Sequence, residues 1–370
     1  MATVDGRALP SSPGEFHPGF FASGFSLAAR RRPATFAGML CLVQAGFESL
    51  LAQELRAAGA VVAASGPGWV RSESGPAEPA FAHVLLRGEA ELAGESVNAL
   101  AQQLADYFMR SLQGERIEAP WPCVFAGPAE LVGLGRRIGG VEKAFHQVLK
   151  KRFARVAKLA VPDLPRGVGA GRGLFVWLTD FGRVLVARDI GVNGQRRMAD
   201  DDLAPSRSYL KVEEAYIVLG REPAAGETVV DLGAAPGGWS YSAAKRGARV
   251  IAVDNGPLKG GALNHPRIEH RMEDAFGFAP ADTQGCDWLF CDMVEEPHHV
   301  LKHIMEPWLT CGWCRRFVVN LKFGRVDPIA LLRELRAEDS VLQRCAPGVR
   351  IRHLYHDREE FTLVGEVTAR

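Results

Sequence analysis

Four short apolar segments, separated by stretches with helical spacing, dominate the sequence after residue 206. They cover residues 228–232, 249–253, 287–291 and 316–322, and a helix predicted over about 208–219 precedes the first. Such segments are typical of strands that are buried on both faces, and helices between them indicate a mostly parallel sheet. The second half of the chain is therefore predicted to be a doubly wound α/β domain.

The first of these strands ends in the turn DLGAAPGG, which begins at Asp231. In a doubly wound sheet, ligands bind at the carboxyl ends of the strands, where the winding reverses. Gly237 and Gly238 permit a tight turn, and the amides of a helix that begins near Gly238 would face an anionic group. Asp254 follows the next strand, where an acidic residue can hold a ribose diol. The pattern predicts a nucleotide-like cofactor.

A nicotinamide-dependent oxidoreductase would share much of this pattern and stays an alternative from another enzyme class. The segment GAAPGG lacks the spacing G-x-G-x-x-G with which such enzymes bind a pyrophosphate. A second alternative is an RNA-binding protein whose enzyme domain is inactive.

The segment 136–197 carries an unusual positive charge. It holds 14 Lys and Arg against 4 Asp and Glu, a net charge of +10, although the whole chain has a net charge of only +1. Residues 141–160 are predicted to form a helix with one apolar and one basic face, and 174–178 and 183–190 to form a hairpin. One basic helix face is usually just solvated, but an excess that continues through a helix, a hairpin and a linker favours a nucleic-acid partner.

Changes of composition and pattern along the chain predict a tail and three domains, and the cysteine count predicts a reducing compartment. Residues 1–34, rich in Gly, Pro and Ser, are expected to be a flexible tail, followed by small α+β domains at 35–110 and 111–192 and the α/β domain at 193–370. Seven cysteines, an odd number, do not fit a secreted disulfide framework. No apolar run is long enough to span a bilayer. We therefore expect a cytoplasmic protein that does not bind a membrane.

Three other motifs are interpreted as structural. The DFG triplet at 180–182 lacks the other kinase elements and is predicted to be a hairpin turn. The C-x-x-C at 311–314 has no second pair to complete a zinc site. The histidines within 298–303 fall on a helical stretch with core positions between them. No metal site is predicted.

The glycine turn resembles that of the Rossmann-like methyltransferases that use S-adenosylmethionine. The further stretches PSRSYLKVEEA, MEDAF, LFCDMVEEP, NLKFG and YHDREEFTLV resemble the ribose 2′-O-methyltransferases of the FtsJ type, and within them the large-subunit ribosomal RNA methyltransferase M enzymes. The similarity is strong over residues 195–325 and 353–364. It implies a ferredoxin-like domain over 35–110, a THUMP-like RNA-binding domain over 111–192 and a Rossmann-like catalytic domain.

The resemblance also implies a cofactor site and a Lys-Asp-Lys-Glu tetrad. By motif, the tetrad is Lys211, Asp292, Lys322 and Glu360, with Glu359 as the alternative to Glu360. The residues expected around S-adenosylmethionine are Ser208, Asp231, Ala235, Pro236, Gly237, Gly238, Asp254, Asp274 and Asp292. Taken alone, Asp274 is equally well explained as a helix N-cap.

The tetrad also has a physical rationale. A ribose hydroxyl is a very weak acid, so its attack on a sulfonium methyl requires a nearby base and a fixed geometry. Two lysines in one pocket disfavour each other's charge, and partial burial lowers the pKa of an amine further. Lys322 is therefore predicted to be a base with a lowered pKa, oriented by the two carboxylates.

Together these patterns predict a monomeric RNA 2′-O-methyltransferase that uses S-adenosylmethionine. The resemblance implies that its substrate is a cytidine of 23S ribosomal RNA, before the large subunit is fully assembled. Another RNA, such as tRNA, is the alternative substrate.

Overall fold

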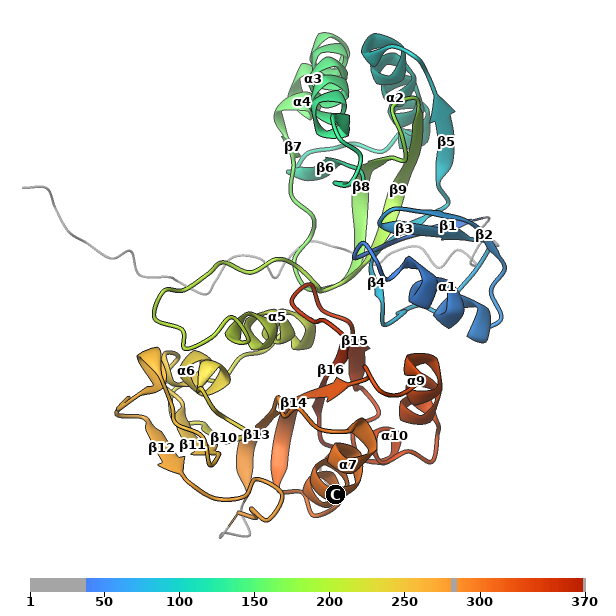
Figure 1. The fold of residues 1–370 in the computed structure, drawn as a ribbon. Helices are drawn as coiled ribbons and strands as arrows, with labels where there is room; N and C mark the ends of the chain where they lie inside the picture. Colours follow the sequence, from blue (N-terminus) through green and yellow to red (C-terminus); the bar gives the residue numbers. More distant parts are fainter. Residues whose placement is uncertain (1–37, 281–284, 369–370) are drawn as a thin grey trace, which may run out of the picture. The chain divides into compact units, whose positions relative to one another are not determined.

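The computed structural model describes residues 38–280 and 285–368, and the predicted tail over residues 1–34 lies outside them. The described residues form an N-terminal and a C-terminal sheet, each with its own helices (Figure 1). No helix in these ranges is long and apolar enough to cross a membrane.

The N-terminal sheet has nine strands in the order β2-β3-β1-β4-β9-β8-β6-β7, and β5 pairs with β9. The strands are β1 (Met39–Val43), β2 (Val62–Gly66), β3 (Trp69–Ser72), β4 (Ala82–Arg87), β5 (Ala90–Ala93), β6 (Trp121–Ala126), β7 (Ala160–Val161), β8 (Val168–Leu178) and β9 (Arg183–Asn193). The helices are α1 (Glu48–Ala57), α2 (Val97–Leu112), α3 (Leu134–Arg152) and α4 (Ala154–Lys158).

This sheet runs through the boundary predicted at residue 110. Strands β4 and β5 from the first range both pair with β9 from the second. Helix α2 also packs into one hydrophobic cluster with α3 and with β8 and β9. The two ranges therefore share a sheet and a core, and the division into a ferredoxin-like and a THUMP-like domain stays a prediction.

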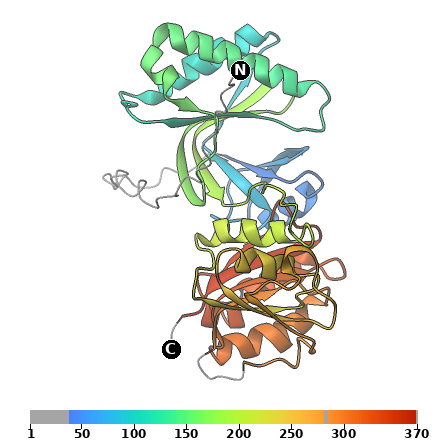
Figure 2. The same cartoon turned by 90° about the vertical axis from the view of Figure 1, so that its left-hand side faces the viewer.

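The basic helix has the two faces that its sequence predicts. Val141, Phe145 and Leu149 of α3 are buried against the sheet, and Figure 2 shows α3 lying across one face of the strands. The helical region begins earlier than predicted and is interrupted at Phe153, whose φ of −143° and ψ of 70° are not helical. The exposed cations of α3 and α4 are Arg136, Lys143, Lys150, Lys151, Arg152, Arg155 and Lys158.

The C-terminal sheet has seven strands in the order β12-β11-β10-β13-β14-β16-β15. They are β10 (Thr228–Leu232), β11 (Arg249–Val253), β12 (Ile268–Arg271), β13 (Cys286–Cys291), β14 (Cys314–Lys322), β15 (Arg350–Arg352) and β16 (Glu360–Glu366). The helical segments are α5 (Tyr209–Leu219), α6 (Gly238–Ala244), η1 (Gly260–Ala262), α7 (Pro297–Val300), η2 (Leu301–Met305), α8 (Glu306–Thr310), α9 (Pro328–Arg336) and α10 (Val341–Cys345).

The predicted doubly wound α/β arrangement is confirmed. Strands β12, β11, β10, β13 and β14 are parallel, whereas β16 is antiparallel to both β14 and β15. Side chains alternate across a strand, so Val229 packs in the cluster of α5 and α6 while Val230 packs in the cluster of η2, α8 and α9. The chain passes from β10 outward to β12 and then returns to β13. The winding reverses at the carboxyl ends of β10 and β13, where ligand sites form.

The motifs interpreted as structural have ordinary surroundings. In the DFG triplet, one carboxylate oxygen of Asp180 accepts the backbone N–H groups of Gly182 at 2.7 Å and Arg183 at 2.8 Å, which confirms the hairpin turn between β8 and β9. His298 forms side-chain contacts with Glu296 and Glu334. Within the described ranges, no group of three or more His, Cys, Asp or Glu side chains could hold a metal ion.

Candidate active site

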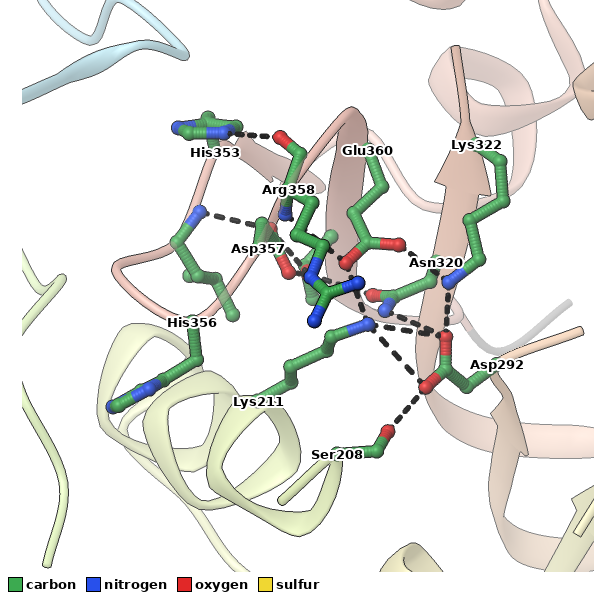
Figure 3. A network of polar contacts seen from close by, with 12 residues as sticks. Ser208, Lys211, Asp292, Asn320, Lys322, His353, His356, Asp357, Arg358 and Glu360 are labelled. Atoms are coloured by element: carbon green, nitrogen blue, oxygen red, sulfur yellow. Dashed lines mark hydrogen bonds and ion pairs between the residues drawn. The ribbon is translucent and has the colours of Figure 1, made fainter. Parts of the chain in front are cut away.

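Sheet topology brings the four tetrad residues to one edge. Asp292 follows the last residue of β13, Lys322 is the last residue of β14, and Glu360 is the first residue of β16. Because β16 is antiparallel to β14, its first residue pairs with the last residue of β14, and Lys322 lies opposite Glu360. Lys211, in the first turn of α5, points to the same place (Figure 3).

The four side chains alternate in charge and are in direct contact. Lys322 Nζ lies 2.5 Å from Asp292 Oδ1 and also contacts Glu360 Oε2. Lys211 Nζ lies 2.5 Å from Glu360 Oε1 and 3.5 Å from Asp292 Oδ2. Ser208 Oγ donates to Asp292 Oδ2. Each lysine therefore bridges the two carboxylates, and each carboxylate contacts both lysines (Figure 3).

Glu360, rather than Glu359, makes these contacts. The side chain of Glu360 is only 5% exposed and accepts from both lysines. Glu359 is exposed, and its carboxylate lies beside Gly324. The difference follows from strand alternation, because successive side chains leave a strand on opposite faces.

The carboxylates of the tetrad are held in their ionised form. Burial alone would raise the pKa of Asp292, but the charges of Lys211 and Lys322 and their hydrogen bonds outweigh it and lower this pKa. The pKa of Glu360 is lowered by the same two lysines against the same effect of burial.

The predicted lowering of the Lys322 pKa is wrong for this arrangement. Burial does lower the pKa of the amine, but the carboxylates of Asp292 and Glu360 favour its charged form more strongly and raise the pKa above its usual value. The two ionised carboxylates are in direct contact with Lys322, so their attraction outweighs the effect of burial on the amine. In the resting protein, Lys322 is therefore an ammonium group.

A cavity of about 320 Å³ lies beside the glycine turn, at the reversal of the winding. Its charged lining groups are all acidic: Asp254, Glu273, Asp274, Asp292 and Glu295. Gly233 and Ala235 also line it. No Lys or Arg lies among the lining residues in the described part of the chain.

Backbone geometry shapes the wall of this cavity. Gly233 has a φ of +74°, and a Cβ there would lie 2.2 Å from Met293 Cγ, so only glycine fits without displacing its neighbour. Asp254 Oδ2 accepts the N–H of Ala235 at 2.9 Å, and its Oδ1 accepts the N–H of Gly256 at 2.6 Å. The glycine turn and the acidic residue after β11 are thereby fixed relative to each other.

The other predicted cofactor residues have different surroundings. Asp274 lines the cavity and accepts the N–H of Phe276 at 3.1 Å within a local turn, and it caps no helix. Asp231 is 1% exposed, accepts from Ser240 Oγ at 2.6 Å and does not line the cavity. Burial raises the pKa of Asp231 to about 7, with a smaller contribution from the Asp292 charge. The remaining residues that do not line this cavity are Ser208, Pro236, Gly237 and Gly238.

A second, larger cavity of about 1080 Å³ opens at the tetrad. Lys211, Lys322, Glu360 and Ser208 line it. Its other charged or aromatic lining groups are Arg207, Glu295, Glu296, Arg325, Tyr355, His356, Asp357, Arg358 and Glu359. Val294 and Glu295 line both cavities, so the two meet beside Asp292.

The sequence motifs did not identify three buried polar residues behind the tetrad. Asn320 Nδ2 donates to Asp292 Oδ1 at 2.9 Å, Thr362 Oγ1 donates to Asn320 Oδ1 at 2.6 Å, and Asp357 lies next to Thr362. The sequence does hold one sign of such a residue, since the polar Asn320 interrupts the apolar strand FVVNLK. A buried polar residue requires a hydrogen-bond partner, but the sequence alone does not identify that partner.

The predicted resemblance is confirmed by comparison with known proteins. Residues 204–329 match the FtsJ-like methyltransferase family. This segment is an FtsJ-like methyltransferase domain. It contains Lys211, Asp292 and Lys322, together with the glycine turn.

Curated relatives with the name Ribosomal RNA large subunit methyltransferase M extend the match. The protein of Marinomonas sp. (strain MWYL1) is 41% identical over 181 residues, which are 46% of this chain and 50% of the relative. That of Laribacter hongkongensis (strain HLHK9) is 35% identical over 247 residues, 62% of this chain and 66% of the relative. That of Actinobacillus pleuropneumoniae serotype 3 (strain JL03) is 43% identical over 169 residues, 43% of this chain and 46% of the relative. The matched region thus spans about half to two thirds of these relatives.

Proposed function

We propose that the protein is an S-adenosylmethionine-dependent methyltransferase that modifies a ribose 2′-hydroxyl of large-subunit ribosomal RNA. One observation supports this proposal above all. A cavity whose charged lining groups are all acidic shares Asp292 with a tetrad of two lysines and two carboxylates. The name of the relatives supports the choice of ribosomal RNA.

The charge of the smaller cavity favours S-adenosylmethionine over a nicotinamide dinucleotide. S-adenosylmethionine supplies an electrophilic methyl group on a positively charged sulfur. A dinucleotide carries a pyrophosphate, which needs cations or aligned backbone amides around it. Five carboxylates without a lining Lys or Arg would repel that pyrophosphate and attract the sulfonium. The oxidoreductase alternative is therefore disfavoured.

Individual residues have definite roles in this proposal. Asp254 accepts hydrogen bonds from the ribose hydroxyls, and Asp274 accepts from the adenine amino group. Asp292 and Ser208 lie toward the methionine end, because Asp292 is shared between the cavity and the tetrad. Asp231 is buried and stabilises the turn through its hydrogen bond with Ser240. Gly237 and Gly238 allow the chain to enter α6.

In the tetrad, Lys322 accepts the proton of the ribose hydroxyl. Asp292 and Glu360 hold its Nζ at the wall of the larger cavity, where the acceptor ribose would lie. Because the pKa of Lys322 is raised in the resting protein, a second positive charge near Asp292 is needed to make the neutral amine accessible. A bound sulfonium would supply that charge, so base activation would be coupled to occupation of the cofactor cavity.

The larger cavity and the basic helix both fit an RNA substrate. The cavity wall includes Arg207, Arg325 and Arg358, which can contact phosphates on either side of the acceptor nucleotide. The cations of α3 and α4 provide a second surface, in the segment with a net charge of +10. We place the ferredoxin-like and THUMP-like domains in this N-terminal part, and we propose that the protein acts as a cytoplasmic monomer on RNA before full assembly of the subunit.

Two measurements test the proposal. Equilibrium binding of S-adenosylmethionine and of NAD should give affinity for the first and none for the second. Methyl transfer to protein-free large-subunit ribosomal RNA should map to a ribose, and a substrate with a single 2′-deoxy substitution at that nucleotide should bind but accept no methyl. Methylation of the deoxy substrate would identify a base atom as the acceptor and contradict the assignment of the tetrad.

A further inference from the structure

Behind the tetrad, a line of buried polar groups ends at Asp357. Asn320 and Thr362 pair across β14 and β16, immediately below the pair Lys322 and Glu360. Asn320 and Thr362 are 0% exposed, and Asp357, at the border of the larger cavity, is 3% exposed. Asp357 precedes β16 in the segment YHDREEF. Figure 3 shows it on the far side of Asn320 from Asp292.

Counting hydrogens in this line leaves one contact without a donor. Thr362 Oγ1 lies 2.6 Å from Asn320 Oδ1, and 2.9 Å and 3.1 Å from Oδ2 and Oδ1 of Asp357. A hydroxyl carries a single hydrogen. The amide oxygen of Asn320 has no hydrogen, so a separation of 2.6 Å between it and Thr362 requires the hydroxyl to donate there. The contact between Thr362 and Asp357 then requires a hydrogen from the carboxyl group.

The orientation of the Asn320 amide is fixed by the other end of the line. Asn320 Nδ2 lies 2.9 Å from Asp292 Oδ1, and Asp292 is ionised because two lysines contact it. Turning the amide over would place its oxygen against a carboxylate oxygen. The amide must therefore donate to Asp292, and its oxygen must face Thr362.

We propose that Asp357 is protonated in the active protein and begins a directional chain of hydrogen bonds that positions Asp292. The chain runs from the Asp357 carboxyl to Thr362, from Thr362 to Asn320, and from Asn320 to Asp292. Asp357, Thr362 and Asn320 act through Asp292 as positioning residues. This role rests on the proposed function, since Asp292 is the carboxylate that holds Lys322.

The surroundings of Asp357 favour the neutral carboxyl. Burial raises the pKa of Asp357 to about 8, and the negative charge of Glu360 on β16 acts in the same direction. From α5, Glu214 is a further acidic neighbour, whereas Lys211 favours ionisation. The backbone N–H of Leu354 donates to Asp357 Oδ2 at 2.8 Å, which leaves Oδ1, 3.1 Å from Thr362 Oγ1, to carry the proton.

Loss of this proton would weaken the tetrad in two ways. Thr362 would turn its hydroxyl toward the ionised carboxylate, and the Asn320 oxygen would lose its donor. A third negative charge would also be added behind Asp292 and Glu360, which would favour the charged form of Lys322. Above pH about 8 these effects oppose the gain in neutral Lys322, so the transfer rate should fall below that of a protein without the Asp357 charge.

Three variants test the chain. Asp357→Asn mimics the protonated carboxyl, because an amide donates from nitrogen and accepts at oxygen but does not titrate. Thr362→Val removes the hydroxyl at nearly constant volume, and Thr362→Ser keeps it as the matched control. Single-turnover methyl transfer to ribosomal RNA is measured against pH at saturating S-adenosylmethionine, with cofactor affinity in parallel. Denaturant midpoints of wild type and Asp357→Asn are measured over the same pH range.

We expect Thr362→Val to lower the rate roughly tenfold at unchanged cofactor affinity, the effect of one lost buried hydrogen bond, and Thr362→Ser to restore it. Above pH about 8, the wild-type rate should fall progressively below that of Asp357→Asn. The same pH profile in both proteins, or a Thr362→Val protein with the wild-type rate, would overturn the chain. A Thr362→Val protein that does not fold leaves the test to the other two variants.

Stability separates failure of the chain from failure of the proposed function. The unfolded carboxyl loses its proton near pH 4, whereas the folded one keeps it up to about 8. The folded state therefore binds more protons in between, and the wild-type midpoint should fall relative to Asp357→Asn as the pH rises through this range. If the difference between the two midpoints does not change with pH, Asp357 is ionised in the folded protein and the proposed chain is wrong. If the wild-type protein transfers no methyl but the midpoints diverge, the chain stands and the proposed function fails.

Discussion

The two cavities that meet at Asp292 differ in how their charges are arranged. The smaller has five acidic and no basic lining groups, and its best-placed carboxylate, that of Asp254, is held by backbone amides. The larger has five basic groups, Arg207, Lys211, Lys322, Arg325 and Arg358, against five acidic ones. One wall is uniform and fixed by the backbone, while the other is mixed and fixed by contacts between side chains.

The difference indicates a division between binding and chemistry. A uniform negative wall attracts a cationic ligand, and removing one of its charges weakens that attraction without changing the reacting groups. Alternating charges in contact set each other's pKa, so removing one member of the tetrad changes the protonation of the rest. Variants of the smaller cavity should therefore change affinity, and variants of the tetrad should change rate and pH dependence.

Replacing Lys322 should give the largest effect. Lys322→Ala should lower single-turnover transfer by about two to four orders of magnitude, the usual cost of losing a positioned base. Cofactor affinity should be retained, because Lys322 does not line the smaller cavity. Lys322→Arg should restore little, since a guanidinium stays protonated. An active Lys322→Arg enzyme with the wild-type pH profile would leave Lys322 only a positioning role.

Neutralising the exposed cations of α3 and α4 should weaken RNA binding and leave cofactor binding unchanged. Lys143, Lys150, Lys151 and Arg155 are exposed, and none has an ion pair among the described residues. Replacing all four with Gln should weaken RNA binding by about a hundredfold at 0.1 M salt if two phosphate contacts are lost, and reduce the salt slope by about two. Glu142→Gln on the same helix is the control and should bind RNA at least as well as wild type. Equal loss of cofactor binding would contradict the separation of the two functions.

Glu360→Gln should shift the pH dependence of the rate. Transfer requires neutral Lys322, so the rate should increase with pH below the raised pKa of that amine. Removing the Glu360 charge takes away one cause of the raised pKa, and the increase should move to lower pH by about one unit. Glu359→Gln is the matched control, because Glu359 is exposed and does not contact either lysine. If the pH dependence of Glu359→Gln shifts by the same amount, the effect comes from the total charge of the larger cavity and not from the contact between Glu360 and Lys322.

Asp254→Asn should produce the smallest of these changes. The variant removes one negative charge and one acceptor from the smaller cavity, and we expect cofactor affinity to fall about tenfold, as for one hydrogen bond to a charged group. The rate at saturating cofactor should stay near that of wild type, with the same pH profile. A lowered saturating rate at unchanged affinity would place Asp254 in the chemical step and remove the distinction between the cavities.

Much of the C-terminal fold could be predicted because its signals are local. The predicted strand bounds 228–232 and 249–253 match β10 and β11, and those of β13 and β14 differ by one or two residues. Period and turn chemistry are properties of neighbouring residues, so they can be recognised before the sheet is known. The N-terminal part was harder to divide, because the pairing of β4 and β5 with β9 joins residues about a hundred positions apart.

The sequence by itself determined where β10, β11, β13 and β14 lie along the chain and where the glycine turn at Asp231 lies, because these depend on neighbouring residues, and its motifs supplied the tetrad through the resemblance. Only the tertiary structure decided that Glu360 faces the lysines, that Asp231 lies beneath the turn and that the pKa of Lys322 is raised. It also brought Asn320, Thr362 and Asp357 into one line. These outcomes depend on strand register, burial and distances between charges, which arise only when segments far apart in the sequence meet.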